Sequence, residues 1–599
     1  MKNICAFFLS VVLCIGMTAA CTTTLFPQKQ GPVDYQKQFQ SAYAQLRIAQ
    51  PAQRPDIQPV VLAHYMPWFQ KYGFHWQEGG AKFDPAQILP DGRANIASHY
   101  YPLTGNYDSA DPLVLEYQLA LMKMAGIDGV IFDWYGITEG IDYKPIQDAT
   151  VVMADMIKER NMQFAVCYED QSIQHLIEFG IVPADQGRAA AKDSFDWMAQ
   201  HWFPENAYVK AEGRPLVLCF GPQYFYQKAD WDAIFSDQNP RPFFIDLDGR
   251  TNWADGTMNW SPMHLSTGGR LGISTLVRYL NDFYGKQESK PFVVGTAVPA
   301  FHDIYAQAGA RPSYGYLDFA DGETFKLTWT AARNARANVI QIQTWNDYGE
   351  GTVIEPTIER GYTCLEFLQD EYLKWKPDFP FNYSDLRIPI ELYKIAASDK
   401  ATDDQKKQVA AIYDMIFSGD AQGMRQAVRA AGIHFDFSVS PLLLETSPGA
   451  GTVAAFDPAG KKNLALGKPA TASSRIDVWT AGKAVDGDTS SYWEGAARAW
   501  PGTLQVDLQS QVKISTVVIK LNPQRMWAKR TQRVEVKTSG DNQNWITAAP
   551  EADYTFDPAA NANTAVIPVD VTARYVQLVF TANSGATNGQ VAEFEVYGE

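Results

Sequence analysis

The pattern of apolar and polar positions divides the chain into two regions. In the first, short apolar runs rich in β-branched residues are typical of strands that are buried on both faces. Helical patterns, such as the one that begins at Asp111-Pro112, separate these runs. The runs are VVLAHY (60–65), GVIFDWY (129–135), QFAVCYED (163–170), PLVLCF (215–220), PFFIDLD (242–248), TMNWSPM (257–263), PFVVGTAVP (291–299) and NVIQIQTW (338–345).

Eight such runs with helical connections predict a (β/α)8 TIM barrel, an α/β fold, over residues 57–380. The sixth run, 257–263, is the weakest strand candidate. A doubly wound open sheet is the alternative architecture, but no Gly-rich phosphate loop follows the first run.

The second region begins at residue 463, where short alternating strands separated by turns predict a β-sandwich over 463–599. Between the two regions, residues 381–462 are predicted to hold a small helical extension, with one or two helices between Thr402 and Gly432. The extension ends in a linker rich in Pro, Gly and Ala, 446–462.

The N-terminus has the features of a targeting segment. Lys2 precedes an apolar stretch that is too short to span a bilayer, and residues 1–20 are the predicted signal peptide. Its end, MTAAC, resembles a bacterial lipoprotein cleavage box, which implies that Cys21 carries lipid; an ordinary secretory signal is the alternative. Residues 21–56 are a predicted tether. The protein is expected in the bacterial cell envelope as a membrane-anchored lipoprotein, periplasmic or on the cell surface.

Charge and cysteine content restrict the possible partners. The net charge is −16, with acids and bases interleaved and no basic block, which argues against nucleic acid as a partner. Beyond Cys21 the chain has Cys167, Cys219 and Cys364, an odd number that leaves no complete disulfide framework. No cluster in the barrel sequence has zinc-ligand spacing, and no cofactor is expected for catalysis.

The segment TWNDYGEGTVIEP, 344–356, carries the strongest chemical indication. It places Asp347 and Glu350 where the eighth strand ends, between Trp345 and Tyr348. Glycoside cleavage needs two carboxyl groups, one to protonate the leaving oxygen and one to assist attack at the sugar carbon. An acidic turn at a strand end is the alternative explanation for this pair.

Other acids and aromatic residues stand at the ends of the remaining strands, where barrel enzymes have their active sites. Aromatic rings can stack on sugar faces and carboxylates can bind hydroxyl groups. Core packing and helix capping are the alternative roles for any one of them. The predicted substrate-binding residues are Tyr65, Trp68, Asp133, Trp134, Tyr135, Tyr168, Glu169, Asp170, Asp246, His302, Trp345, Asn346 and Tyr348.

The barrel resembles glycoside hydrolase families 71 and 99. The resemblance rests on AHYMPW (63–68), HYYPLTGNYDSADP (99–112), AGIDGVIFDWYG (125–136), GYLDFADGETFKLTW (315–329) and TWNDYGEGTVIEP. TWNDYGE is similar to family 71, whose members are endo-α-1,3-glucanases. GTVIEP is similar to family 99, whose members are endo-α-mannosidases and have Glu where Asp347 stands. The resemblance implies that Asp347 and Glu350 are the catalytic pair.

The C-terminal region resembles the discoidin, or coagulation factor 5/8 type C, domain and carbohydrate-binding module family 32, a galactose-binding-like jelly roll. The matching segments include NLALGKPATASS (463–474) and AVDGDTSSYWE (484–494). The resemblance implies glycan binding and a structural Ca²⁺ with Asp486, Asp488 and Glu593 as ligands; a plain Asp-Gly-Asp turn is the alternative. The segment PQRMWAKRTQ resembles domains attached to bacterial α-1,3-glucanases.

Together these features predict an endo-acting α-glycoside hydrolase that cleaves a polysaccharide, α-1,3-glucan, by a two-carboxylate mechanism. The alternatives are an endo-α-mannosidase of the family 99 type and a glycan-capturing lipoprotein without activity.

Overall fold

The computed structural model describes residues 35–433 and 462–598, except for 49, 52–53, 80–81, 477–478, 490, 497, 523–526, 528 and 559–560. Internal contacts divide the chain into two units, Met1–Pro380 with Leu392–Met424 and Phe381–Glu391 with Arg425–Glu599. Cys21 lies outside the described residues, so its lipidation stays a prediction. In the described part of the chain, no helix is both long and apolar enough to cross a membrane.

The first unit contains a closed barrel of parallel strands, which confirms the predicted fold. The sheet runs in the order β5-β4-β1-β13-β10-β9-β8-β7, and β5 pairs with β7 to close it. Each of the eight apolar runs forms a strand, including the weak sixth one. The strands are β1 (Val60–Tyr65), β4 (Gly129–Trp134), β5 (Gln163–Tyr168), β7 (Arg214–Cys219), β8 (Phe243–Leu247), β9 (Gly256–Met258), β10 (Val293–Ala297) and β13 (Val339–Ile342).

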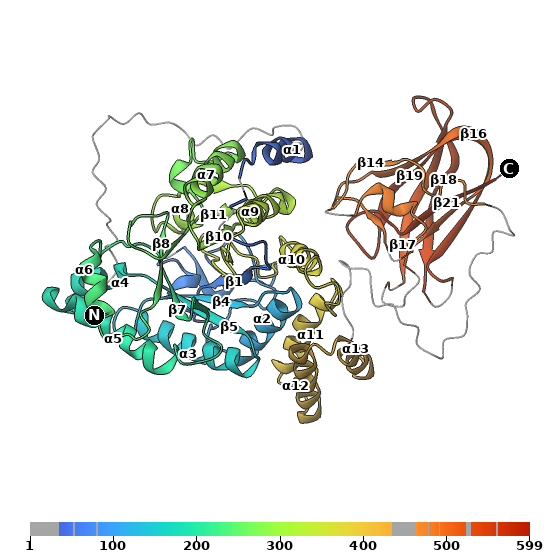
Figure 1. Cartoon of the computed structure of the whole chain (residues 1–599). Helices are drawn as coiled ribbons and strands as arrows, with labels where there is room; N and C mark the ends of the chain where they lie inside the picture. Colours follow the sequence, from blue (N-terminus) through green and yellow to red (C-terminus); the bar gives the residue numbers. More distant parts are fainter. Residues whose placement is uncertain are drawn as a thin grey trace. The chain divides into compact units, whose positions relative to one another are not determined.

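Helices surround the strands (Figure 1). Asp111 caps α2, as predicted, by accepting a hydrogen bond from the backbone N–H of Leu113. One connection departs from the regular pattern, because the fully described segment 248–255 joins β8 to β9 without a helix. The main helices are α2 (Pro112–Met124), α3 (Tyr143–Glu159), α4 (Gln171–Glu178), α5 (Gly187–His201), α6 (Lys228–Ile234), α7 (Ile273–Lys286), α9 (Glu323–Asn334) and α10 (Thr363–Leu373).

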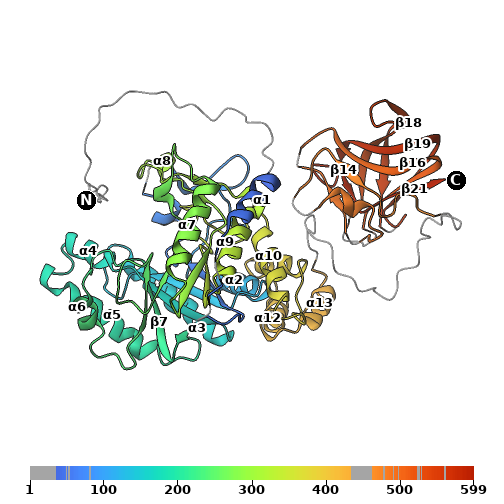
Figure 2. The same cartoon turned by 45° about the horizontal axis from the view of Figure 1, so that its top comes forward.

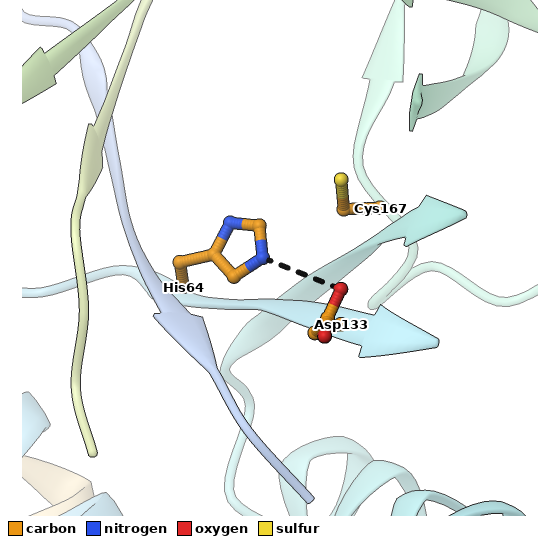
Figure 3. A group of neighbouring side chains, drawn as sticks. All are labelled: His64, Asp133 and Cys167. Atoms are coloured by element: carbon orange, nitrogen blue, oxygen red, sulfur yellow. Dashed lines mark ion pairs between the residues drawn. The ribbon is translucent and has the colours of Figure 1, made fainter. Parts of the chain in front are cut away.

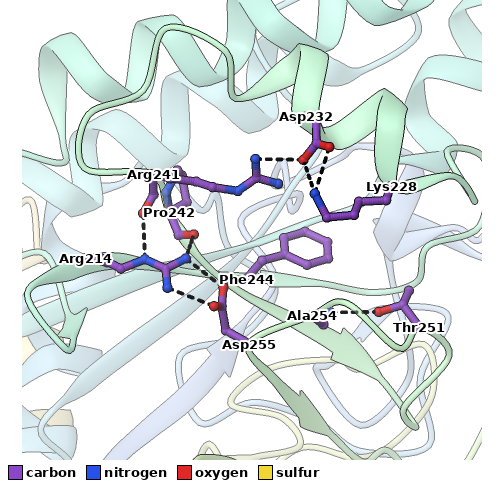
Figure 4. A network of polar contacts seen from close by, with 9 residues as sticks. All are labelled: Arg214, Lys228, Asp232, Arg241, Pro242, Phe244, Thr251, Ala254 and Asp255. Atoms are coloured by element: carbon purple, nitrogen blue, oxygen red, sulfur yellow. Dashed lines mark hydrogen bonds and ion pairs between the residues drawn. The ribbon is translucent and has the colours of Figure 1, made fainter.

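A polar network fastens three strands where they begin, at the opposite end from the predicted site (Figure 4). The Arg214 guanidinium at the start of β7 donates to both carboxylate oxygens of Asp255, at 2.8 and 2.7 Å, just before β9. It also donates to the carbonyl oxygens of Arg241 and Pro242, which precede β8. Paired hydrogen bonds of this kind are directional and strong, so this end of the barrel contributes stability.

Helices also lie outside the regular barrel. Part of the predicted tether is helical: α1 (Tyr35–Gln45) packs against α7 and α9 and buries Phe39 and Ala42. The region after the barrel contains α11 (Ile388–Ala396), α12 (Asp403–Ser418) and α13 (Ala421–Ala430). A capping box between Thr402 and Gln405 begins α12, and Gly419 ends it in the left-handed conformation.

The C-terminal region forms an antiparallel sheet domain, as predicted (Figure 2). Its main sheet has the order β14-β16-β19-β17-β18, and β21 pairs with β16. Inward positions along β16 and β19, such as Leu504, Val506, Val576 and Leu578, are fully buried. The strands are β14 (Ala470–Ala472), β15 (Trp493–Glu494), β16 (Gly502–Lys520), β17 (Arg530–Ser539), β18 (Trp545–Phe556), β19 (Thr564–Asn583), β20 (Gln590–Val591) and β21 (Glu593–Gly598).

Candidate active site

Successive side chains at the strand ends alternate between the helix layer and the barrel interior, as strand geometry requires. Tyr65 is fully buried and its hydroxyl donates to Gln118 on α2 at 2.8 Å. Trp134 donates from Nε1 to Gln147 on α3 at 2.6 Å. Tyr168 packs on the rings of Phe195 and Trp231. The structure thus places these three predicted substrate contacts in the packing between strands and helices.

Further predicted substrate contacts also make internal bonds. Asp170 is fully buried and accepts hydrogen bonds from the backbone N–H groups of residues 223–225, so it holds the loop that follows β7. Asn346 pairs with both backbone groups of Met66, at 2.8 and 3.0 Å. Tyr348 donates to Glu355 at 2.9 Å. Trp345 is completely buried.

The predicted catalytic pair lies in the loop after β13. The backbone N–H of Asp347 donates to the Thr344 hydroxyl at 2.8 Å, and Asp347 Oδ1 accepts from the backbone N–H of Glu350 at 2.9 Å. The Tyr305 hydroxyl approaches Glu350 Oε1 at 3.4 Å. These bonds fix the turn, so both carboxyl groups come from one short, ordered segment.

The surroundings of the pair favour the protonated form of both acids. Burial raises the pKa of Asp347 to about 6, against the hydrogen bond from Glu350. Burial, and then the charge of Asp347, raise the pKa of Glu350 well above its usual range, while Arg311 opposes this shift. A buried pair of carboxyl groups with unequal pKa values is suited to divided acid and base roles.

Two further predicted acids lie next to this pair. Burial, followed by the charge of Asp133, raises the pKa of Glu169 well above its usual range, and Glu350 adds to the shift. The charge of Asp133 also raises the pKa of Asp347. The structure therefore brings Asp133, Glu169, Asp347 and Glu350 together at the carboxyl ends of the strands.

Glu78, on the long loop after β1, was not among the predicted site residues. A Cβ placed on Gly349 would lie 2.6 Å from Glu78 Oε1 and 3.5 Å from Asp347 Oδ1, so this glycine allows the two acids to approach. Burial raises the pKa of Glu78 to about 7. His75 opposes this shift, and the charge of Asp347 adds to it. The other site residues were predicted because they stand at the ends of strands. Glu78 does not stand at the end of a strand, so this signal could not find it.

A cavity of about 560 Å³ opens beside Glu169 and has the size of a small-ligand site. Tyr135 and His75 line it, and Trp68 stacks on His75 with ring centroids 4.7 Å apart. Trp68 also lies 6.5 Å from the ring of Tyr135. The structure therefore groups two predicted aromatic contacts, Trp68 and Tyr135, near the acids.

The remaining predicted barrel residues lie apart from this group. His302 stacks on His99 with centroids 3.6 Å apart, and burial, then the charges of His99 and Arg360, lowers its pKa to about 4. His302 still reaches the loop of the pair, because its backbone N–H donates to Glu350 O at 2.8 Å. Asp246 is buried and accepts from the backbone N–H of Thr251 at 2.6 Å.

In the C-terminal domain, two of the three predicted calcium ligands face each other. Glu593 accepts from the backbone N–H of Gly487, and one of its oxygens is buried without a hydrogen-bond partner. Burial, then the charge of Asp486, raises the pKa of Glu593 to about 8. Asp488 is exposed and donates its backbone N–H to Asp486. This unpaired acidic oxygen fits a hard cation.

Comparison with known proteins agrees with both halves of this description. Residues 469–594 match the family model of the F5/8 type C domain. The chain is 24% identical over 364 residues to the glycoprotein endo-α-1,2-mannosidase-like protein of Danio rerio, which covers 55% of this chain and 74% of that protein. It is 21% identical over 371 residues to the glycoprotein endo-α-1,2-mannosidase of Rattus norvegicus, with the same coverage of 55% and 74%.

Solved structures with similarity include the GH99 endo-α-mannosidase from Bacteroides thetaiotaomicron, at 16% identity and a TM-score of 0.40 over 54% of this chain and 99% of that chain. Another is the chitosan-binding module 1 of a chitosanase/glucanase from Paenibacillus sp. IK-5, at 27% identity and a TM-score of 0.19 over 23% and 99%.

The chain is a glycoside hydrolase with a C-terminal F5/8 type C domain, which confirms the predicted enzyme class. The relatives named above give the predicted α-1,3-glucan specificity no support, since both have an endo-α-1,2-mannosidase name.

Proposed function

We propose that this protein is an endo-acting α-mannosidase that cleaves α-mannoside bonds inside a larger glycan. The observation that carries the catalytic part of the proposal is the pair of the buried Asp347 and the half-buried Glu350, held by one hydrogen-bonded turn at the carboxyl end of β13. The activity in the names of the curated relatives supports the choice of an α-mannoside over an α-1,3-glucan.

In the proposed mechanism, Glu350 is the general acid and Asp347 is the general base. Glu350 has the more strongly raised pKa, so its carboxyl group keeps a proton that it can give to the leaving glycosidic oxygen. Asp347, with a pKa of about 6, is ionised near neutral pH and accepts a proton from the water molecule that attacks the sugar carbon. Trp68 and Tyr135 offer aromatic faces for sugar rings.

Incubation with an α-1,2-linked mannan and with an α-1,3-glucan, followed by measurement of new reducing ends and product sizes, tests the proposal. We expect oligosaccharide products from the mannan alone, and none from the Asp347→Asn variant. Cleavage of the glucan alone would restore the α-1,3-glucanase hypothesis. Glycan binding without cleavage of either polymer would support the capturing lipoprotein instead.

We extend the proposal to the other parts of the chain. The F5/8 type C domain binds glycan, and Glu593 and Asp486 hold a structural Ca²⁺ in it. A lipid on Cys21 anchors the enzyme to an envelope membrane. Removal of calcium should lower the melting temperature of wild type but not that of Glu593→Gln. Cys21→Ser should move the enzyme from the membrane fraction to the soluble fraction, and a variant that stays in the membrane fraction would refute the anchor.

A further inference from the structure

Three side chains that the proposed mechanism does not use lie close to one another inside the barrel, and His64 and Asp133 point toward each other (Figure 3). They are His64 of β1, Asp133 of β4 and Cys167 of β5, and one ligand atom of each lies within 4.8 Å of the other two. All three are at most 3% exposed. In the described part of the chain, no other group of His, Cys, Asp or Glu side chains meets this spacing.

A hydrogen-bond chain fixes which nitrogen of His64 faces the group. Gln341 donates from Nε2 to the carbonyl oxygen of Asn259 at 3.2 Å and to Thr296 at 2.9 Å. Its Oε1 is therefore the acceptor that lies 3.3 Å from His64 Nδ1, so Nδ1 carries the proton. The other ring nitrogen, Nε2, faces Asp133 Oδ1 at 3.9 Å.

The neutral form of His64 with its proton on Nδ1 would turn the lone pair of Nε2 toward the Asp133 carboxylate. An imidazole lone pair and a carboxylate oxygen are both acceptors, and their burial removes the water that would otherwise separate them. Aromatic rings cover one side of the group: Trp260 lies edge-on to His64 at 4.9 Å and Phe220 packs on Trp260. A cation between the three ligand atoms would satisfy both acceptors.

We propose that His64, Asp133 and Cys167 bind one Zn²⁺ ion inside the barrel, near the carboxyl ends of β1, β4 and β5. Nitrogen, oxygen and sulfur ligands at about 2.0–2.3 Å in tetrahedral geometry stand about 3.3–3.7 Å apart, which the observed group reaches by small side-chain movements. The thiolate selects a thiophilic ion over Mg²⁺ or Ca²⁺. On binding, the Cys167 thiol releases its proton to solvent, and thiolate and carboxylate together balance the two positive charges.

Gln341 then has the role of an outer partner that orients a metal-binding histidine through its other ring nitrogen. The proposal gives Asp133 a structural role in place of the predicted sugar contact. The three ligands come from three strands that are distant in sequence, which explains why zinc-ligand spacing is not visible in the chain.

Metal analysis of the purified full-length protein tests this site. We expect about one zinc ion per chain after extensive dialysis, and zinc-edge X-ray absorption should show a single sulfur ligand with nitrogen or oxygen completing the shell. Replacement by Co²⁺ should give a thiolate-to-metal charge-transfer band in the near ultraviolet.

Variants distinguish this site from others on the chain. Cys167→Ser should lose the charge-transfer band, while Cys364→Ser, which removes another buried thiol, and Glu593→Gln, which alters the proposed calcium site, should keep it. Circular dichroism checks that each variant folds. The zinc-edge X-ray absorption measurement uses only the wild type, so it tests the site even if a variant does not fold. Wild-type protein without bound zinc, a zinc shell without sulfur, or a band that survives in Cys167→Ser would overturn the proposal.

Discussion

Two sets of acids on the loop after β13 differ in the hydrogen-bond donors that surround them: Glu355, and the pair Asp347 and Glu350. Glu355 accepts from Gln118, Tyr107 and Tyr348, each at 2.9 Å. Among the described residues, the carboxyl group of Asp347 accepts one hydrogen bond, from the backbone of Glu350, and the carboxyl group of Glu350 accepts one long one, from Tyr305. Burial raises the pKa of Glu355 to about 7 and that of Asp347 to about 6, so burial and pKa alone do not separate them.

The difference shows how to tell a structural acid from a chemical one. The oxygens of Glu355 are occupied by protein donors, whereas the carboxyl groups of the proposed catalytic pair have fewer such donors and can bond to a substrate. Substitutions of Asp347 or Glu350 should therefore lower activity with little effect on stability. Substitutions of Glu355 should change stability and leave activity intact.

The largest effect is expected from Glu350→Gln and Asp347→Asn. Each should lower kcat by about 10²–10⁴-fold, since each removes one proton-transfer group, and should leave the melting temperature within a few degrees of wild type. Glu355→Gln is the matched control and should retain activity. Near-full activity in either catalytic variant would remove that residue from the proposed mechanism.

The next effect concerns the pH dependence of stability. The folded pKa of Glu355 is raised from 4.5 to about 7, so its stabilising contribution is complete below pH 4.5 and is lost as the pH rises toward 7. The free energy of unfolding of the wild type should fall by about 3 kcal/mol over that range, and that of Glu355→Gln should not. Denaturant unfolding at pH 5 and pH 8 measures the difference. Glu139→Gln, at an exposed site, should unfold like wild type at both pH values, and an unchanged pH dependence in Glu355→Gln would contradict the assigned burial.

The pH profile of kcat should be bell-shaped. Activity should fall about tenfold per pH unit below about 6, where Asp347 becomes protonated, and should fall again above the raised pKa of Glu350. The charge of Arg311 lowers both pKa values, so Arg311→Met should shift both limbs to higher pH. A profile that stays in place would show that other groups control the reaction.

The smallest effect is expected from Tyr348→Phe, which removes one donor from Glu355. The loss of one buried hydrogen bond should lower the free energy of unfolding by about 1 kcal/mol, while kcat stays the same. Tyr226→Phe, at an exposed tyrosine, should change neither quantity. A large drop in kcat for Tyr348→Phe would mean that the two acid groups are coupled.

The sequence was sufficient for the strands and for the rim on which the proposed catalytic pair lies, because buried parallel strands leave continuous apolar runs. The sequence analysis did not separate side chains that point into the barrel from side chains that point to the helices at the carboxyl ends of the strands. Alternation could have done so, since Tyr65 and Trp134 directly follow the inward His64 and Asp133. Glu78 could not be predicted, because its place depends on how the long loop after β1 folds. The missing helix before β9 was predictable from the short connection, 248–255.

The side chain of Asn346 has a further consequence. Its amide group bonds to the backbone N–H and carbonyl of Met66, as a peptide unit of a neighbouring strand would. It thus adds one more link to the ladder between β1 and β13, the first and the last strand of the barrel. The proposed base, Asp347, is the next residue, so the side chain that ties β13 to β1 also holds the start of the loop that carries this base. A substitution that removes this link would therefore loosen the proposed site directly, while the other pairings of the ladder remain.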